Sequence, residues 1–257
     1  MGIRVGVVGA GGKMGTAVCA AVSADSGLDL VAAVDPMAAG QERSGMVISG
    51  SLDAVERAGA EVVVDFTVAS AARETLPWLA QRGMHAVVGT TGFSEDDLAS
   101  FRTAFTSSNC LVAANFAIGA VLMMRFAELA APFFETAEII EMHHDAKADA
   151  PSGTAVTTAN RMAAARTTPW AADPTQHEVY PGARGGLGPT GIRVHAVRMR
   201  GMIATQEVIL GTTGQTLTVR HDTFDRASFM PGVVLACHRI AARPERFTLG
   251  LEPVLGL

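Results

Sequence analysis

VGVVGAGGKMG, residues 5–15, gives the strongest indication of the fold. A valine-rich run leads into a turn in which glycines recur at a spacing of three, at Gly9, Gly12 and Gly15. Glycine lets the backbone turn tightly and approach a pyrophosphate, and the start of the following helix offers free N–H groups and the positive end of its dipole. The stretch therefore predicts a strand, a turn and a helix that bind a dinucleotide. The alternative is a tight turn that holds no ligand.

An acidic residue supports the dinucleotide interpretation. Asp35 ends the next apolar run, 20 residues after Gly15. A carboxylate at that place accepts hydrogen bonds from an adenosine ribose and repels a 2′-phosphate. Pro36 follows where an NADP-dependent enzyme often carries an arginine, although Lys13 in the turn attracts phosphate. We expect NADH to be used at least as well as NADPH. The other interpretation of Asp35 is an ordinary carboxylate at the end of a strand.

Strand and helix patterns alternate up to about residue 114. Apolar runs predict strands over residues 3–8, 28–34, 61–66, 85–88 and 110–114, and helical patterns between them cover residues 14–24, 69–81 and 94–106. This alternation predicts an α/β fold with a doubly wound parallel sheet. The motifs DFT (residues 65–67) and GTTG (residues 89–92) follow strands at their carboxyl ends, where such sheets bind ligands. A simple strand-end turn is an equally open interpretation of each motif alone.

The second half of the chain has a different pattern. Helices are expected over residues 118–134 and 153–166, a strand over 137–143, and a long loop over 167–191. Three β-rich runs follow at residues 192–199, 203–210 and 215–221, with a hairpin turn at 211–214, before a closing helix at 227–241. The pattern predicts a second, α+β domain that is rich in antiparallel strands.

Composition excludes several classes of protein. The 257 residues carry a net charge of −5, which gives no support to a nucleic-acid partner. The three cysteines are widely spaced and odd in number, so neither a disulfide framework nor a zinc ribbon is expected. We expect no signal peptide and no membrane span, and therefore a cytoplasmic protein.

The stretch EMHHDAKADAPSGTA, residues 141–155, is the second candidate site. Neighbouring side chains of a strand point to opposite faces, so His143 and His144 are poorly placed to share one metal ion, and no metal is expected. Imidazole exchanges protons near neutral pH, and Lys147 supplies a positive charge nearby. A solvated surface loop is the alternative for any one of these residues taken alone.

A helix start lies at the end of the same stretch. Pro151 is tolerated in the first turn of a helix, and Ser152 or Asp149 is expected to cap it. The N–H groups of Gly153 and Thr154 would then be free to bind an anion. Together with the histidines and Lys147, this start predicts a pocket that binds a carboxylate beside a proton-handling group.

Residues 138–155, EIIEMHHDAKADAPSGTA, closely resemble the signature of the 4-hydroxy-tetrahydrodipicolinate reductase (dihydrodipicolinate reductase) family. The resemblance covers essentially the whole chain, because GAGGKMG, DFT, VVGTTGF and AANFAIGA occur in the family's order. It implies a Rossmann-type cofactor domain over residues 1–114, to which residues 224–257 return. It also implies a substrate-binding domain over residues 115–223, whose mostly antiparallel open sheet builds a homotetramer.

The resemblance further implies a reaction and the residues that perform it. Hydride would pass from NADH or NADPH to the cyclic imine dicarboxylate 4-hydroxy-tetrahydrodipicolinate, with loss of water, in the diaminopimelate route to lysine. His143 matches the family's proton donor and acceptor, and Lys147 its proton-donor lysine. His144, Gly153 and Thr154 match its substrate contacts. The matched cofactor-binding positions are Gly9, Ala10, Gly11, Gly12, Lys13, Met14, Asp35, Gly89, Thr90, Thr91, Ala113, Ala114, Asn115 and Phe116.

One departure and two alternatives remain. Asp145 and Ala146 stand where many members have a further histidine before the lysine, so the charge of the substrate pocket differs. A reductase of the aspartate-semialdehyde or homoserine type is less well supported, because no cysteine resembles a nucleophile in a strand-to-helix turn. A non-catalytic NAD-binding regulator would retain the glycine turn but would leave the set from His143 to Thr154 unexplained.

Overall fold

The computed structural model describes residues 2–257 and divides into two compact units. The first unit comprises the chain up to Ile118 together with Arg226–Leu257, and the second comprises Gly119–Asp225. These boundaries fall a few residues later than the 114 and 223 expected from the sequence. None of the helices within residues 2–257 has the length and apolar character needed to cross a membrane.

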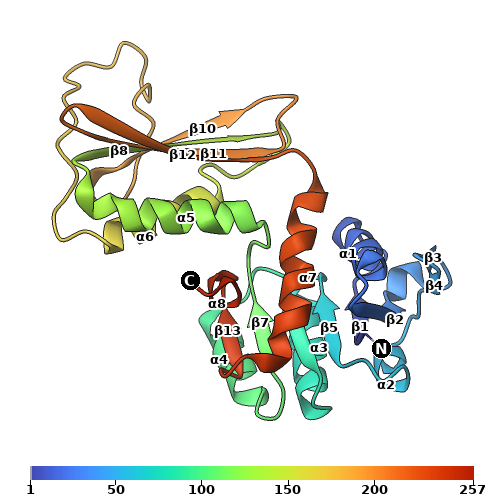
Figure 1. The fold of residues 1–257 in the computed structure, drawn as a ribbon. Helices are drawn as coiled ribbons and strands as arrows, with labels where there is room; N and C mark the ends of the chain where they lie inside the picture. The colour runs from blue at the N-terminus through green and yellow to red at the C-terminus, as the bar shows by residue number, and fades with distance from the viewer. Residues whose placement is uncertain (1) are drawn as a thin grey trace. The chain divides into compact units, whose positions relative to one another are not determined.

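The first unit is built on a six-stranded sheet in which every strand is parallel to its neighbours (Figure 1). The strand order is β13-β7-β6-β5-β1-β2. The strands are β1 (Ile3–Val8), β2 (Leu28–Val34), β5 (Val62–Asp65), β6 (His85–Val88), β7 (Cys110–Val112) and β13 (Phe247–Leu249). Their valine-rich sequences suit strands that are buried on both faces. The predicted doubly wound parallel sheet is confirmed.

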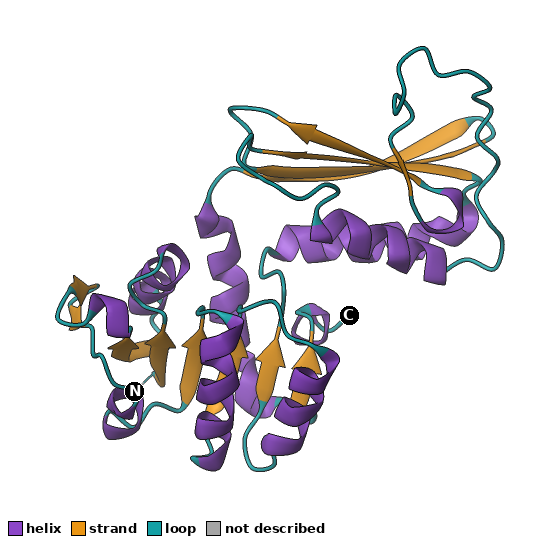
Figure 2. Ribbon diagram, turned by 180° about the vertical axis from the view of Figure 1, so that it is seen from behind, coloured by secondary structure: helices purple, strands orange, loops and turns teal. Residues whose placement is uncertain are grey.

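Helices cover both faces of this sheet. Figure 2 shows α3 (Ala69–Gln81) and α4 (Glu95–Ala104) in front of the sheet, whereas α1 (Lys13–Ala24) and α7 (Met230–Arg239) lie on its other face. Ser94 and Asp97 form a capping box at the start of α4, and each side chain accepts the other residue's backbone N–H. The sequence pattern did not predict α2 (Asp53–Arg57) or the small hairpin of β3 (Glu42–Arg43) and β4 (Met46–Val47).

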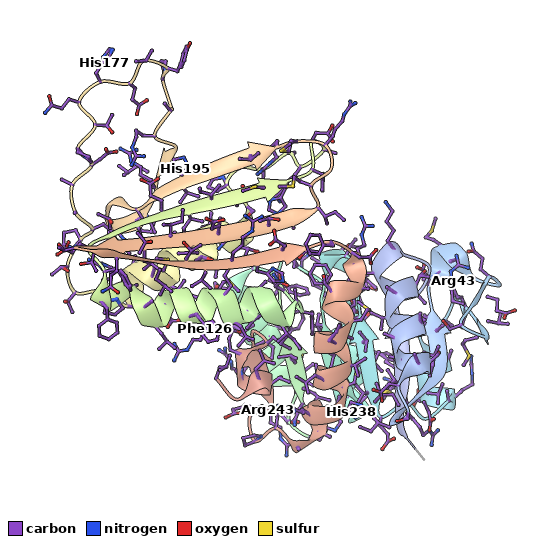
Figure 3. All side chains as sticks on the ribbon, turned by 45° about the horizontal axis from the view of Figure 1, so that its top comes forward. Arg43, Phe126, His177, His195, His238 and Arg243 are labelled. Atoms are coloured by element: carbon purple, nitrogen blue, oxygen red, sulfur yellow. The ribbon has the colours of Figure 1, made fainter. Side chains whose placement is uncertain are left out.

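The C-terminal segment completes the first unit. The edge strand β13 pairs with β7, and α7 packs against α1. The Asn109 side chain donates hydrogen bonds to the carbonyl oxygens of Ile240 (2.8 Å) and Arg243 (2.9 Å). His238, labelled in Figure 3, adds a 3.0 Å contact from its Nε2 atom to Asp25. The closing helix that was expected over residues 227–241 is wrong in detail, because 3₁₀ turns at Arg226–Phe229 and Ile240–Ala242 flank the α-helix.

The second unit is a mixed, mostly antiparallel sheet with helices on one face (Figure 1). The strand order is β12-β11-β8-β10-β9. The strands are β8 (Thr136–His143), β9 (Gly186–Leu187), β10 (Arg193–Arg198), β11 (Ala204–Thr212) and β12 (Gln215–Thr223). Helices α5 (Ile118–Ala130) and α6 (Gly153–Ala164) pack on the face that carries Ile139, Val208 and Leu210.

The predicted predominance of antiparallel strands in this unit is confirmed, since only β10 and β8 pair in parallel among its described strands. The helix expected over residues 118–134 ends as an α-helix at Ala130, because Pro132 brings on a 3₁₀ turn over Ala131–Phe133. The expected loop at 167–191 is irregular except for β9 and a 3₁₀ turn at Pro189–Gly191, and buried Trp170 fixes its start in the core.

Candidate active site

In the glycine turn between β1 and α1, two glycines occupy positions where a side chain would clash with the backbone. Gly9 has a positive φ of 81°, and a Cβ atom on it would lie 2.5 Å from the carbonyl oxygen of Phe66. A Cβ atom on Gly15 would lie 2.0 Å from the carbonyl oxygen of Gly9. Gly12 caps α1 without a side-chain hydrogen bond, and the first turn carries no acidic residue. The helix start therefore offers its N–H groups and positive dipole end to an anion.

Asp35 lies directly beside this turn. Its Oδ2 atom accepts a hydrogen bond from the backbone N–H of Gly11 (3.0 Å), and its Oδ1 atom accepts one from that of Met37 (2.9 Å). The turn itself is tied to β2, because Gly9 and Ala10 both donate their N–H groups to the carbonyl oxygen of Val34. The predicted residues 9–14 and Asp35 are thus brought together at the carboxyl ends of β1 and β2.

A buried acid organises the carboxyl ends of β5 and β6. The Oδ1 atom of Asp65 accepts hydrogen bonds from the hydroxyls of Thr67 (2.7 Å) and Thr90 (2.8 Å) and from the backbone N–H of Thr67 (3.0 Å). Burial raises the pKa of Asp65, and the hydrogen bonds from the two threonines oppose that shift. The Thr90 hydroxyl donates its proton to Asp65 and accepts the backbone N–H of Thr67 (2.9 Å). The DFT motif indicates Asp65 in the sequence. Its hydrogen bond with Thr90 joins the ends of two different strands, so the sequence pattern did not predict it.

The remaining predicted cofactor positions lie at the same edge of the sheet. A Cβ atom on Gly89 would lie 2.1 Å from the ring of Phe66, whose centroid is 5.7 Å from that of Phe116. The Asn115 side chain accepts the N–H of Ala117 (2.8 Å) and forms a turn ahead of α5. Of the other positions, Ala113 is buried, whereas Thr91 and Ala114 are exposed.

The histidine pair lies at the end of β8 in the second unit. The Nδ1 atom of His143 is 2.5 Å from Oε2 of Glu141, and its side chain is 17% exposed. His144 follows the last residue of the strand and is exposed. Lys147 donates hydrogen bonds from Nζ to both carboxylate oxygens of Asp149, at 2.7 and 2.9 Å. Across the described chain, no group of three or more His, Cys, Asp or Glu side chains is placed to hold a metal ion.

The start of α6 is capped by Ser152, one of the two residues that the sequence indicated. Its hydroxyl accepts the N–H of Ala155 (3.2 Å), so Gly153 and Thr154 are the first two residues of the helix. Pro151 therefore precedes the cap, and its predicted place in the first turn is wrong. A Cβ atom on Gly153 would meet no atom within 4 Å, so the space beside the helix start is open.

Glu141 and Arg198, which the sequence analysis did not single out, connect the histidine at the end of β8 with the start of α6. Glu141 is fully buried and accepts two hydrogen bonds from Arg198, Nη1 to Oε2 at 2.9 Å and Nη2 to Oε1 at 2.7 Å. It also accepts the backbone N–H of Ser152 at 3.0 Å. Arg198 Nη2 donates to the carbonyl oxygen of Asp149 as well, at 2.6 Å. Glu141 stands two residues before His143, so strand alternation could have indicated it. Arg198 is 57 residues away from Glu141, and only strand pairing brings it close.

This ion pair has a consequence for acid stability. Burial alone would raise the pKa of Glu141, but hydrogen bonds from Arg198, His143 and Ser152 outweigh it and hold the pKa below its ordinary 4.5. The stabilisation is then fully present above pH 4.5 and is lost as the pH falls through the lowered pKa. We expect the free energy of unfolding, measured with urea at stepped pH, to fall below about pH 4.5. A free energy of unfolding that stays the same between pH 6 and pH 3 would contradict this expectation.

The comparisons with known proteins cover almost the whole chain. A family model described as dihydrodipicolinate reductase, N-terminus, matches residues 3–116, and one described as dihydrodipicolinate reductase, C-terminus, matches residues 119–255. The 4-hydroxy-tetrahydrodipicolinate reductase of Nocardia farcinica is 49% identical over 100% of both chains. That of Thermobifida fusca is 51% identical over 99% of this chain and 100% of its own.

Solved structures agree with these relatives. The dipicolinate-bound dihydrodipicolinate reductase from Paenisporosarcina sp. TG-14 has a TM-score of 0.90 at 37% identity, over 98% of this chain and 99% of that one. A D-galactose-1-dehydrogenase from Rhizobium etli has a TM-score of 0.63 at 11% identity, over 99% and 92% of the two chains, which shows a shared fold alone. The full-length matches establish that this chain belongs to the dihydrodipicolinate reductase family.

Proposed function

We propose that this protein reduces (2S,4S)-4-hydroxy-2,3,4,5-tetrahydrodipicolinate to 2,3,4,5-tetrahydrodipicolinate with NAD(P)H and loss of water, in the diaminopimelate route of lysine biosynthesis. Curated relatives of about half-identical sequence carry the name of this activity over their full length. The observation that carries the proposal is the folded signature stretch. One buried carboxylate, Glu141, contacts both His143 and the start of α6, so a proton-handling group and an anion-binding helix start are held together.

The first unit fits the nicotinamide cofactor that the family uses. The glycine turn leaves no room for a side chain at Gly9 or Gly15, and the start of α1 has no side-chain cap. Asp35 lies beside Gly11, where a ribose would be held. Residues 9–14, Asp35, 89–91 and 113–116 would bind the cofactor, which supplies a hydride when bound. The threonine pair on Asp65 fixes the crevice in which the nicotinamide end would lie.

In the second unit, the chain's own groups bind the dicarboxylate and move protons. The free N–H groups of Gly153 and Thr154 hold one carboxylate, and His144 provides a second contact. Loss of the 4-hydroxyl as water leaves a conjugated imine, and hydride addition at ring carbon four leaves an enamine that must take up a proton. His143 and Lys147 handle that proton, because imidazole exchanges protons near neutral pH and the Lys147 ammonium group can donate one.

The direct test is turnover. The purified protein is mixed with NADH and the product of the preceding synthase, and NADH oxidation is followed by absorbance. We expect steady oxidation that depends on both components. NADH binding, measured by titration, without any oxidation would instead identify a non-catalytic NAD-binding regulator. Oxidation with aspartate semialdehyde in place of the dicarboxylate would identify a different amino-acid reductase.

Asp35 leads us to propose that NADH is used at least as well as NADPH. Its carboxylate would accept ribose hydroxyls and repel a 2′-phosphate, and Pro36 supplies no compensating positive charge. We expect Asp35→Ala to raise KM for NADH about tenfold, the effect of losing a charge-assisted hydrogen bond, and to raise KM for NADPH less. Steady-state kinetics of both proteins with both cofactors check this. A large preference of the wild-type protein for NADPH would overturn it.

We also propose a homotetramer that works in the cytoplasm. The sheet of the second unit has helices on one face, and the opposite face carries half-buried Ile140, Met142 and Ile209, which suit contact with another copy. All three cysteines are buried and free, as expected in a reducing compartment. Light scattering on the eluted protein should give four times the 26.7 kDa of one chain. A mass of one chain at micromolar concentration would contradict the tetramer.

A further inference from the structure

We infer that Glu141, held by Arg198, is the positioning residue that fixes the tautomer and orientation of His143. The inference rests on the proposed function, since it concerns how His143 serves the same reaction. Neither residue belongs to the predicted set of substrate or cofactor contacts. Both act through other groups, Glu141 through the imidazole and Arg198 through the Glu141 carboxylate.

The contact between Glu141 and His143 determines which ring nitrogen of His143 carries the proton. An ionised carboxylate only accepts hydrogen bonds, so the 2.5 Å contact from Oε2 to Nδ1 places the imidazole proton on Nδ1. The other ring nitrogen, Nε2, is then the atom that His143 presents to substrate. Loss of the carboxylate would let the proton move between the two nitrogens and the ring turn about its Cβ–Cγ bond.

Arg198 fixes the carboxylate itself. The guanidinium binds both oxygens of Glu141 in a bidentate pair, and the N–H of Ser152 occupies the remaining acceptor site at Oε1. The same guanidinium binds the carbonyl oxygen of Asp149, whose side chain holds Lys147. One buried ion pair therefore sets the positions of His143, of the loop that carries Lys147, and of the start of α6.

The same strand supplies a matched control. Glu138 contacts His195 (Nε2 to Oε2, 2.5 Å) and Arg184 (Nη2 to Oε1, 2.5 Å), so it too stands between a histidine and an arginine. Glu138 and Glu141 are three positions apart, which places their side chains on opposite faces of β8. Figure 3 labels His195 on β10. If such histidine–glutamate–arginine groups served only the stability of the fold, replacing either glutamate would have the same effect on kcat. If Glu141 positions His143, only its replacement lowers kcat strongly.

The experiment compares Glu141→Gln with Glu138→Gln. We expect Glu141→Gln to lower kcat about 100-fold, the lower end of what general acid–base catalysis contributes, with KM for NADH unchanged. Its solvent deuterium isotope effect should increase, because proton transfer becomes slower than the other steps. Glu138→Gln should keep kcat within about twofold of the wild type. Equal losses in both variants, or an unchanged isotope effect in Glu141→Gln, would overturn the inference.

Nitrogen-15 spectra of the histidines provide a readout that is independent of turnover. His143 in the wild-type protein should show a protonated Nδ1 and an unprotonated Nε2, and Glu141→Gln should show a mixture of both tautomers. A spectrum unchanged by Glu141→Gln would overturn the inference. A wild-type protein with no turnover would refute the proposed function, and these spectra would still decide the tautomer.

A double variant tests the inference even if Glu141→Gln alone does not fold. Removing one partner of a buried ion pair leaves the other charge unpaired, whereas replacing both is often tolerated. We therefore expect Glu141→Gln/Arg198→Met to fold and to reproduce the loss in kcat and the mixed tautomers. Wild-type kcat in this folded double variant would overturn the positioning role.

Discussion

Replacement of Lys147 by alanine is expected to reduce kcat by about 10³-fold, within the range that general acid–base catalysis contributes. The ammonium group lies in the loop between β8 and α6, where Asp149 binds it through both carboxylate oxygens. Alanine removes the group that we propose as the proton donor, together with the positive charge that would face a substrate carboxylate. Pre-steady-state and steady-state NADH oxidation with saturating dicarboxylate measure the loss.

The chain contains a matched control for this substitution. Lys13 is the other lysine in the sequence, and it lies in the first turn of α1 at the glycine turn. Lys13→Ala should raise KM for the cofactor and leave kcat nearly unchanged, whereas Lys147→Ala should leave cofactor binding intact. A Lys147→Ala protein that retained more than a tenth of the wild-type kcat would refute the role proposed for Lys147.

Replacement of Gly15 by alanine is expected to abolish cofactor binding and to lower the free energy of unfolding by about 3 kcal/mol, the upper end of overpacking costs. The new Cβ atom would stand 2.0 Å from the Gly9 carbonyl oxygen, a backbone atom that cannot move without opening the turn. Urea denaturation measures the loss of stability, and calorimetric titration with NADH measures binding.

Gly12→Ala is the control for crowding in the same turn. Its Cβ atom would lie 3.3 Å from the same carbonyl oxygen, and its φ of −71° suits any residue. We expect a change in unfolding free energy well below that of Gly15→Ala. A Gly15→Ala protein that unfolds at the same urea concentration as the wild type and still binds NADH would show that the turn tolerates a side chain.

Patterns that depend on neighbouring residues were predictable from the sequence. Valine-rich runs and punctuating glycines predict the strands β1, β2, β5, β6 and β7 and the helices α1, α3 and α4, and the spacing of the glycines predicts the glycine turn. Ser152 was one of two expected caps because serine caps helices through a local hydrogen bond. Pro151 was expected in the first turn of the helix but lies one position before the cap, and such a difference is within the usual uncertainty of a helix boundary.

Contacts between distant strands were not predictable in this way. The parallel pairing of β10 with β8 depends on how the chain crosses the unit through residues 144–192, a path that no local period records. That pairing places Arg198 beside His143 and so creates the ion pair with Glu141. The tie between Asp65 and Thr90 arises similarly, because β5 and β6 are neighbours only in the folded sheet.

The edge strand β13 has a consequence for the order in which the chain can fold during synthesis. Residues 247–249 form an edge strand of the six-stranded sheet, so the ribosome must synthesise the chain as far as Leu249 before that sheet can close. Every strand of the unit Gly119–Asp225 is already synthesised by then. Because domains fold as units as they emerge, the inserted unit can be complete while the unit that begins the chain still awaits its final strand.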